Sequence, residues 1–138
     1  MTALKLDLII TKENKGYSGS LTFNNNPLTQ SASSIQGVET QLKKLLSEFE
    51  SLDPKTVEFN HYYQCPAFFS EFAILNREQL ALLTDIETAR LEAFASGKEK
   101  PTVDEAKRLE KALRELAARL LKTSLILSWI NWYCLPSS

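Results

Sequence analysis

The chain has 138 residues, of which 43% are hydrophobic and 24% are charged, and its formal net charge is −1. This length suits one domain or two small ones and excludes a large multidomain enzyme. The composition is typical of a folded globular protein rather than of a disordered one. Because positive and negative charges nearly cancel, the whole chain has no electrostatic reason to bind nucleic acid, and any basic surface must be local.

The cysteines and the two ends of the chain indicate the cellular compartment of the protein. Cys65 and Cys134 stand far apart and outside any CxxC pattern, which argues against a zinc site or a disulfide scaffold. The N-terminus lacks an export signal, so we expect a cytoplasmic protein with reduced thiols. The apolar tail from Leu125 to Leu135 is about half the ~20 residues that cross a bilayer, so we expect no membrane partner.

The N-terminal residues alternate apolar and polar side chains, as half-buried strands do. Residues 4–11 and 17–23 follow this pattern on either side of a polar turn that ends in Gly16. The pattern predicts a β-hairpin. Residues 28–30 are a candidate for a short third strand.

A helix and another strand are predicted next. Ser33 and Gln36 have the spacing of a capping box, and apolar residues then recur at helical spacing as far as Leu52. The Asp-Pro pair that follows ends this helix, and residues 56–63 are rich in β-branched and aromatic side chains, which favour a strand. We therefore expect residues 1–64 to form a β-β-(β)-α-β two-layer sandwich.

From Cys65 onwards the apolar pattern changes to that of short helices. Residues 67–75 carry phenylalanines at spacings that suit a helix with one strongly apolar side. Asn76 and Gln79 have the spacing of a helix cap, which predicts the start of a second short helix.

Two further helices complete the prediction. Residues 87–96 form the first, and Gly97 suits its end because glycine enters the left-handed conformation without steric cost. Thr102 and Glu105 form the clearest capping box in the chain. They open a long amphipathic helix that runs to Leu121. The expected fold class is thus α+β, with an all-α domain after the sandwich.

Residues 79–102 have the features of a helix-turn-helix. Two helices too short to be stable alone would cross over a small core, and Ala81 must be small because the second helix crosses close to it. The Leu-Ala pair ending at Ala81, the aliphatic Ile86 and the Gly-Lys-Glu-Lys-Pro loop at 97–101 resemble the repressor-type helix-turn-helix family. The predicted core consists of Leu80, Ala81, Ile86 and Leu91.

This resemblance implies a set of DNA contacts. In such domains the second helix enters the major groove with its N-terminal side chains at base edges, while flanking groups contact phosphates. The implied base-facing residues are Thr88, Ala89 and Glu92, the implied phosphate-facing residues are Arg77, Ser96, Lys98 and Lys100, and Arg90 suits either role.

Departures from the family pattern affect the expected affinity. Asp85 stands where the family usually has glycine, and Glu87 where serine or threonine usually caps the helix. Residues 76–122 contain ten Lys or Arg and nine Asp or Glu. Binding by one copy should therefore be weak and sensitive to salt, and a homodimer or higher homo-oligomer would strengthen it by doubling the phosphate contacts.

The order of the two halves narrows the resemblance. A β-hairpin, a serine-capped helix, a Val-Glu-Phe strand, an aromatic helix, the helix-turn-helix and a long closing helix together resemble a HicB-like antitoxin over residues 4–124. The resemblance implies that the N-terminal half is a partial RNase H-like fold that masks a HicA-type mRNA interferase. It also implies that the C-terminal half represses its operon by binding operator double-stranded DNA.

Other classes of function stay open at this point. We favour the antitoxin, and the alternative within DNA binding is a stand-alone dimeric repressor whose N-terminal domain senses a ligand or dimerises. The chain would also suit an interaction module that does not bind DNA, in which the helix-turn-helix serves only packing. A genomic neighbour encoding a small basic ribonuclease favours the antitoxin, and a solitary gene favours the repressor.

Enzyme-like features are few. His61 is the only histidine, and no Ser-His-Asp or Cys-His arrangement accompanies it. Asp7, Glu13 and Glu58 are the carboxylates that a two-metal nuclease inherited from an RNase H ancestor would use, but we interpret them as charges on the solvent face of half-exposed strands. With four glycines and no P-loop, a nucleotide site is not expected. We predict no catalytic residue, metal or cofactor.

The chain ends in an aromatic tail. Such a segment either folds back onto its own core or is buried against a second subunit, and we favour a dimer contact. The predicted organisation is a toxin-binding domain at 1–64, a DNA-binding domain at 65–123 and a tail at 124–138. The tail residues assigned to the dimer contact are Trp129, Ile130, Trp132 and Tyr133.

Overall fold

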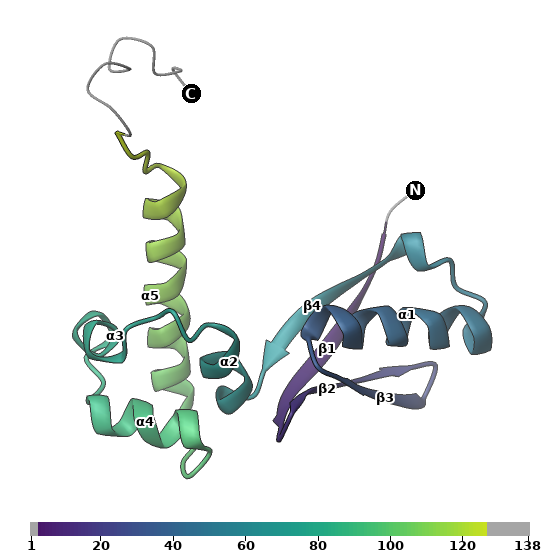
Figure 1. Cartoon of the computed structure of the whole chain (residues 1–138), viewed down its shortest axis with the longest axis horizontal. Coiled ribbons are helices and arrows are strands. Elements are labelled where there is room, and N and C mark those ends of the chain that lie inside the picture. Colours follow the sequence, from purple (N-terminus) through teal and green to yellow (C-terminus); the bar gives the residue numbers. More distant parts are fainter. Residues whose placement is uncertain (1–2, 127–138) are drawn as a thin grey trace.

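The computed structural model describes residues 3–126, which form an α+β structure with a four-stranded mixed sheet and five α-helices (Figure 1). The sheet and the helix that covers it form one lobe, and the later helices form a second lobe beside the end of the sheet. The elements in chain order are β1 (Leu4–Glu13), β2 (Gly16–Phe23), β3 (Asn26–Ala32), α1 (Ile35–Glu50), a 3-10 turn (Pro54–Thr56), β4 (Val57–Tyr63), α2 (Cys65–Glu71), α3 (Arg77–Thr84), α4 (Thr88–Ser96) and α5 (Val103–Leu121).

The strand order is β3-β2-β1-β4. β1 and β2 form the predicted hairpin, and β3 continues it as a full strand rather than a three-residue one. β3 starts at once because Asn24 and Asn25 both adopt positive φ, which makes a two-residue hairpin turn. β4 pairs in parallel with β1. The connection from β3 to β4 therefore crosses one face of the sheet, and it does so as α1.

The first core lies between the sheet and α1. Side chains that alternate along β1 and β2 meet one face of α1, while the opposite face of the sheet stays uncovered by any described element. The buried members of this core are Leu8, Ile10, Tyr17, Leu21, Val38, Leu42, Leu46, Val57 and Ala67.

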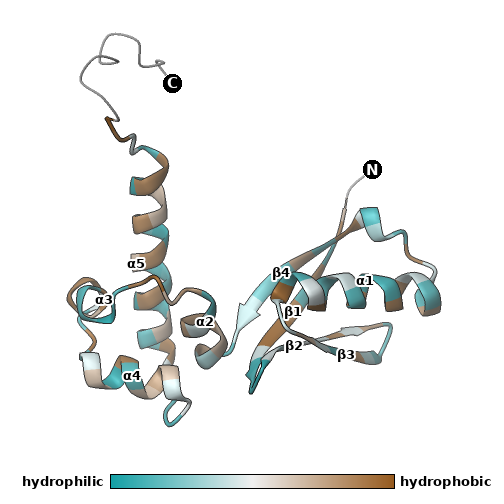
Figure 2. Cartoon of the chain, viewed as in Figure 1, coloured by the Kyte–Doolittle hydropathy of each residue, from teal (hydrophilic) through white to brown (hydrophobic). Residues whose placement is uncertain are grey.

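The second core lies inside the helical lobe. It contains side chains from α2, α3, α4 and α5, and Figure 2 shows that hydrophobic and hydrophilic residues alternate along α5. The buried members are Phe69, Leu80, Ile86, Leu91, Phe94 and Leu109. Every helix within residues 3–126 is too short or too polar to span a bilayer.

Two sequence predictions need correction. The cap of α1 is Ser34, whose hydroxyl accepts from the Gly37 N–H at 3.0 Å, and not Ser33. The helix predicted over 67–75 is instead α2, which starts at Cys65 because Pro66 suits a first helical turn. It stops at Glu71, so Leu75 lies in the connection to α3.

Candidate nucleic-acid interface

α3 and α4 lie where the sequence predicts the helix-turn-helix, and three residues connect them. Asn76 caps α3 by accepting from the Gln79 N–H at 3.0 Å, as its spacing predicts. The chain leaves α3 through Asp85, which adopts a left-handed φ of 57°, and α4 ends at Gly97 with φ 81°. Asp85 thus ends α3 and Gly97 ends α4, and the connection between the two helices is three residues long.

The side chains between α3 and α4 hold the two helices together. Leu80, Ile86 and Leu91 are buried as predicted, and Ala81 is partly buried against the same core. Phe94 joins them and is fully buried. The crossing therefore rests on packing that two isolated short helices lack.

Arg108 of α5 fixes the turn from the other side. Its guanidinium donates to the carbonyl oxygens of Thr84 and Asp85 at 3.0 and 2.9 Å. These carbonyls lie at the end of α3, where no helical partner remains for them. No local pattern indicates this role, because Arg108 lies more than twenty positions from both carbonyls along the chain.

One face of α4 is uncovered and consists of small or polar side chains. Ala89, Glu92 and Ser96 are exposed, and their spacing places them on one side of the helix. Thr88 at the start of α4 is half-buried. Among the residues predicted to face phosphates, Lys98 and Lys100 are exposed in the loop after α4.

An ion pair joins two residues of the predicted DNA-contacting set. Arg77 of α3 donates to a Glu92 carboxylate oxygen of α4 at 2.6 Å. The guanidinium also lies over the Phe69 ring, 5.4 Å from its centre. Arg77 and Glu92 therefore hold α3 and α4 together, and DNA would have to compete for both side chains.

Arg90 has more side-chain partners than Arg77. Its guanidinium donates to both carboxylate oxygens of Glu105 at 2.5 and 2.9 Å and pairs with Glu99. It also stacks on the Phe94 ring at 5.1 Å. Because these partners occupy its donors, Arg90 is a positioning residue in this structure and is not among the DNA contacts proposed below.

Glu105 has two partners at once. It completes the predicted capping box, accepting from the Thr102 N–H at 2.9 Å, and it accepts the bidentate bonds from Arg90. The hydrogen bonds from Arg90, followed by those from Thr102, lower the pKa of its carboxyl to about 2. α4 and α5 are thus joined by a carboxylate that stays ionised at neutral pH.

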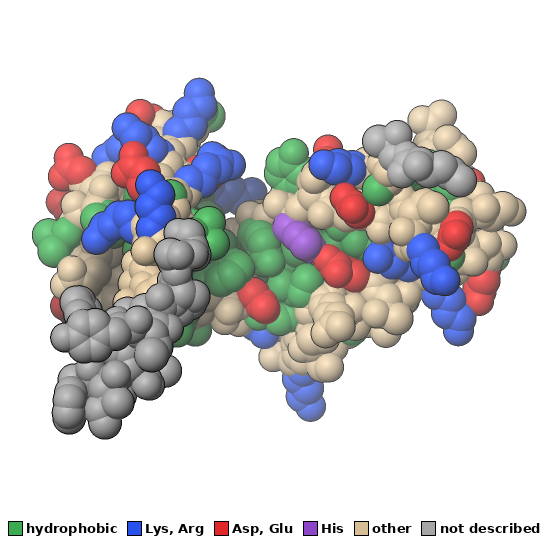
Figure 3. Space-filling view, turned by 90° about the horizontal axis from the view of Figure 1, so that it is seen from above, with side chains coloured by type: hydrophobic (Ala, Val, Ile, Leu, Met, Phe, Trp, Pro, Cys, Tyr) green, Lys and Arg blue, Asp and Glu red, His purple; other side chains and the backbone are tan. Residues whose placement is uncertain are grey.

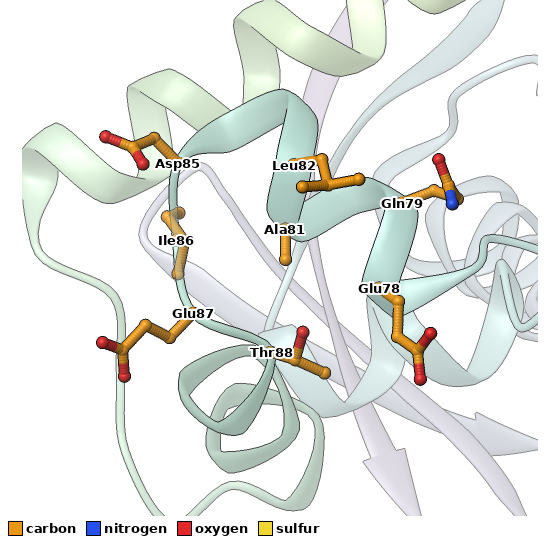
Figure 4. A pocket seen from close by; sticks show the side chains of 8 residues that line it. All are labelled: Glu78, Gln79, Ala81, Leu82, Asp85, Ile86, Glu87 and Thr88. Atoms are coloured by element: carbon orange, nitrogen blue, oxygen red, sulfur yellow. The ribbon is translucent and has the colours of Figure 1, made fainter.

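The outer side of the turn is acidic. An open depression of about 570 Å³ lies there, and Figure 4 shows Ala81, Ile86 and Thr88 between the two helices, with Glu78 and Glu87 at its rim. Among residues 3–126, no lysine or arginine lines it. The end of α4 that would approach DNA first is therefore flanked by negative charge.

The enzyme-like residues of the N-terminal half do not converge. Glu39 of α1 pairs with His61, Asp7 accepts from Asn60 at 3.3 Å, and Glu13 accepts from Ser31 at 2.5 Å. Within residues 3–126 no group of three acidic, histidine or cysteine side chains is arranged to hold a metal ion. The predicted tail contacts at Trp129, Ile130, Trp132 and Tyr133 lie outside the described residues.

Comparisons with protein-family models, with curated proteins and with solved structures found no match.

Proposed function

We propose that this protein is a DNA-binding regulator that contacts double-stranded DNA through α4. The observation that carries this proposal is the exposed face of α4, where Ala89, Glu92 and Ser96 lie on one side of a helix fixed by its neighbours. Small side chains let a helix come close to the floor of a major groove. Lys98 and Lys100 follow immediately and suit phosphate contacts.

The charges around α4 make the proposed binding weak for one copy. Glu78 and Glu87 repel phosphates, and Glu92 is neutralised only through its pair with Arg77. Two copies on a palindromic operator double the favourable contacts. The proposed DNA-binding form is therefore an oligomer.

We further propose that the N-terminal lobe binds a protein and that the chain acts as a HicB-like antitoxin. The strand order β3-β2-β1-β4 with one parallel pair is compatible with a partial RNase H-like fold, which the sequence resemblance implies. In this proposal the lobe covers the RNA-cleaving surface of a HicA-type toxin, and the helical lobe represses the operon. A stand-alone repressor is the alternative within DNA binding.

The DNA proposal is tested by fluorescence anisotropy with the chain's own promoter over a series of salt concentrations. We expect Lys98→Ala/Lys100→Ala to weaken binding and to reduce the slope of log K against log salt by about 2, since each lysine neutralises roughly one phosphate. Lys107→Ala/Lys111→Ala on α5 removes the same charge from exposed positions outside the α3–α4 unit. This control should leave more of the affinity intact.

Absence of any binding at low salt would reject the DNA proposal. Equal losses of affinity for the two double variants would reject the assigned loop, because they would show a response to net charge alone. The antitoxin proposal has a separate test, co-expression with the neighbouring open reading frame. It predicts that a small basic ribonuclease co-purifies with the chain and loses activity in the complex.

The acidic depression favours a second candidate, an interaction module whose α3–α4 unit binds a basic protein. Glu78, Asp85 and Glu87 give that surface a charge that suits lysine or arginine side chains better than phosphates. Glu78→Gln/Glu87→Gln separates the candidates. The change should strengthen DNA binding by removing repulsion, whereas it should weaken the binding of a basic partner.

A further inference from the structure

The two edges of the sheet differ in how they are protected against pairing with another strand. β3 forms one edge and carries Pro27 at an exposed position, which blunts strand addition. β4 forms the other edge with the sequence Val-Glu-Phe-Asn-His-Tyr-Tyr, which contains neither proline nor lysine. Asn60, His61 and Tyr62 are exposed along it. An aromatic edge strand without such protection is a ready template for another strand.

The peptide groups at the middle of this edge point away from the sheet. Gln64 directs its N–H towards β1, where it donates to the Ile10 carbonyl at 2.9 Å. Peptide groups of successive residues point to opposite sides of a strand, so those of Phe59 and His61 face outward. Within residues 3–126, β4 pairs only with β1, and no backbone hydrogen bond joins Phe59 or His61 to another element.

Neighbouring groups occupy both ends of β4 but leave the middle of this edge strand open. The Val57 N–H is taken by the Pro54 carbonyl at the start of β4. At the other end, Tyr63 packs against the rings of Phe68 and Phe72, 6.0 and 5.8 Å away between ring centres. Figure 3 shows hydrophobic side chains gathered between the lobes beside the single histidine. The accessible stretch is therefore residues 58–62.

We propose that a second copy of this chain pairs its β4 antiparallel with β4, about a twofold axis at Asn60, to join the two four-stranded sheets into one continuous sheet. The outward groups then match, because Phe59 of each copy lies opposite His61 of the other and forms a hydrogen-bonded pair with it. The backbone groups that the single chain leaves open are satisfied in this arrangement.

The side chains make the strand complementary to itself. Glu58 carries the only carboxylate of β4, and the twofold pairing places it opposite Tyr62 of the second copy, so that no like charges face each other. On the other face of the strand, the aromatic ring of Phe59 in one copy lies opposite His61 of the second copy. Opposed aromatic residues stabilise antiparallel pairs. This self-complementarity favours a second copy over a foreign strand, and it does not depend on the proposed DNA binding.

The test measures the mass of the full-length chain in solution by analytical ultracentrifugation, without DNA. We expect a dimer for the wild type. Tyr62→Glu should shift it towards monomer by at least about tenfold in Kd, because the new carboxylate lies opposite Glu58 of the second copy. Tyr62→Lys should stay dimeric, since a lysine opposite Glu58 is attractive.

Ile9→Glu is the matched control. Ile9 is the register partner of Tyr62 on β1 and has a similar exposure, 47% against 56%, but it lies on an inner strand. This variant should stay dimeric. His61→Pro removes an outward N–H without removing a bond to β1, and should give a monomer whose circular dichroism spectrum matches the wild type.

Three outcomes would overturn the proposal. One is a monomeric wild type at concentrations well above those in a cell. Another is a dimer that neither Tyr62→Glu nor folded His61→Pro disturbs, which would place the contact elsewhere, such as the exposed Leu120 and Leu121 at the end of α5. The third is equal disruption by Tyr62→Glu and Tyr62→Lys, which would rule out the register.

Discussion

At Gly19 the sheet and α1 come so close that a side chain does not fit. A Cβ atom there would lie 2.5 Å from Val38 Cγ1 and 2.9 Å from Leu8 Cδ1. These neighbours are fully buried core residues of α1 and β1, so they have little room to move. The missing side chain is what allows the helix to cover the centre of the sheet.

We predict that Gly19→Ala destabilises the protein by about 1–3 kcal/mol, the usual cost of overpacking a core. Thr22→Ala is the control, because Thr22 is an exposed residue of the same strand. It should change the free energy of unfolding by about 0.5 kcal/mol or less. Urea unfolding followed by circular dichroism gives both values, and equal effects of the two changes would contradict the close approach of helix and sheet.

Glu105 makes stability depend on pH in a definite direction. Its pKa is lowered from 4.5 to about 2 in the folded chain. A carboxyl whose pKa falls on folding contributes stability above its unfolded pKa and loses that contribution as pH drops towards the folded pKa. We therefore predict that Glu105→Gln is less stable than the wild type at pH 7 and that the difference shrinks between about pH 4.5 and 2.

Thermal unfolding of both proteins over this pH range measures the effect. Glu110→Gln, on the same helix, controls for the loss of an exposed carboxylate. A difference between Glu105→Gln and the wild type that stays constant down to the lowest pH would show that the bonds from Arg90 and Thr102 do not favour the ionised form.

The turn between α3 and α4 places Asp85 in a backbone conformation that a residue with a side chain does not favour. Asp85 adopts a φ of 57°, and left-handed backbone costs a residue with a side chain roughly 1–2 kcal/mol more than glycine. We predict that Asp85→Gly raises the free energy of unfolding by about 0.5–1 kcal/mol. Glu87→Gly is the control in the same turn, where φ is −61°, and it should lower stability. A loss of stability on Asp85→Gly would contradict the conformation of this turn.

Local sequence patterns predict most of the helices and strands, whereas features that depend on contacts between distant segments do not follow from them. The caps at Asn76, Gly97 and Thr102 were predictable because each depends on residues within four positions. The parallel return of β4 and the role of Arg108 depend on contacts between distant segments. Arg90 shows the same limit at the candidate site, because a periodic pattern places it on α4 but cannot reveal that α5 supplies a carboxylate for it.

For the whole molecule, α2 is the element that joins the two lobes. Its Ala67 belongs to the core under α1, and its Phe69 belongs to the core of the helical lobe. Tyr17 of β2 also donates its hydroxyl hydrogen to Ser70 of α2 at 3.1 Å. A helix of seven residues thus contributes to both cores, which makes the relative position of the sheet and the helical lobe depend on α2.

Phe69→Ala tests how far the two lobes share their stability. Removing this buried ring should cost the helical lobe about 3–5 kcal/mol, since it leaves a cavity in that core. We predict that amide hydrogen exchange accelerates in α3, α4 and α5, while β1 and β2 keep most of their protection because their core lies under α1. Phe49→Ala on α1, where the ring is 72% exposed, should change neither lobe. Equal loss of protection in both lobes would instead show that α2 makes the protein one cooperative unit.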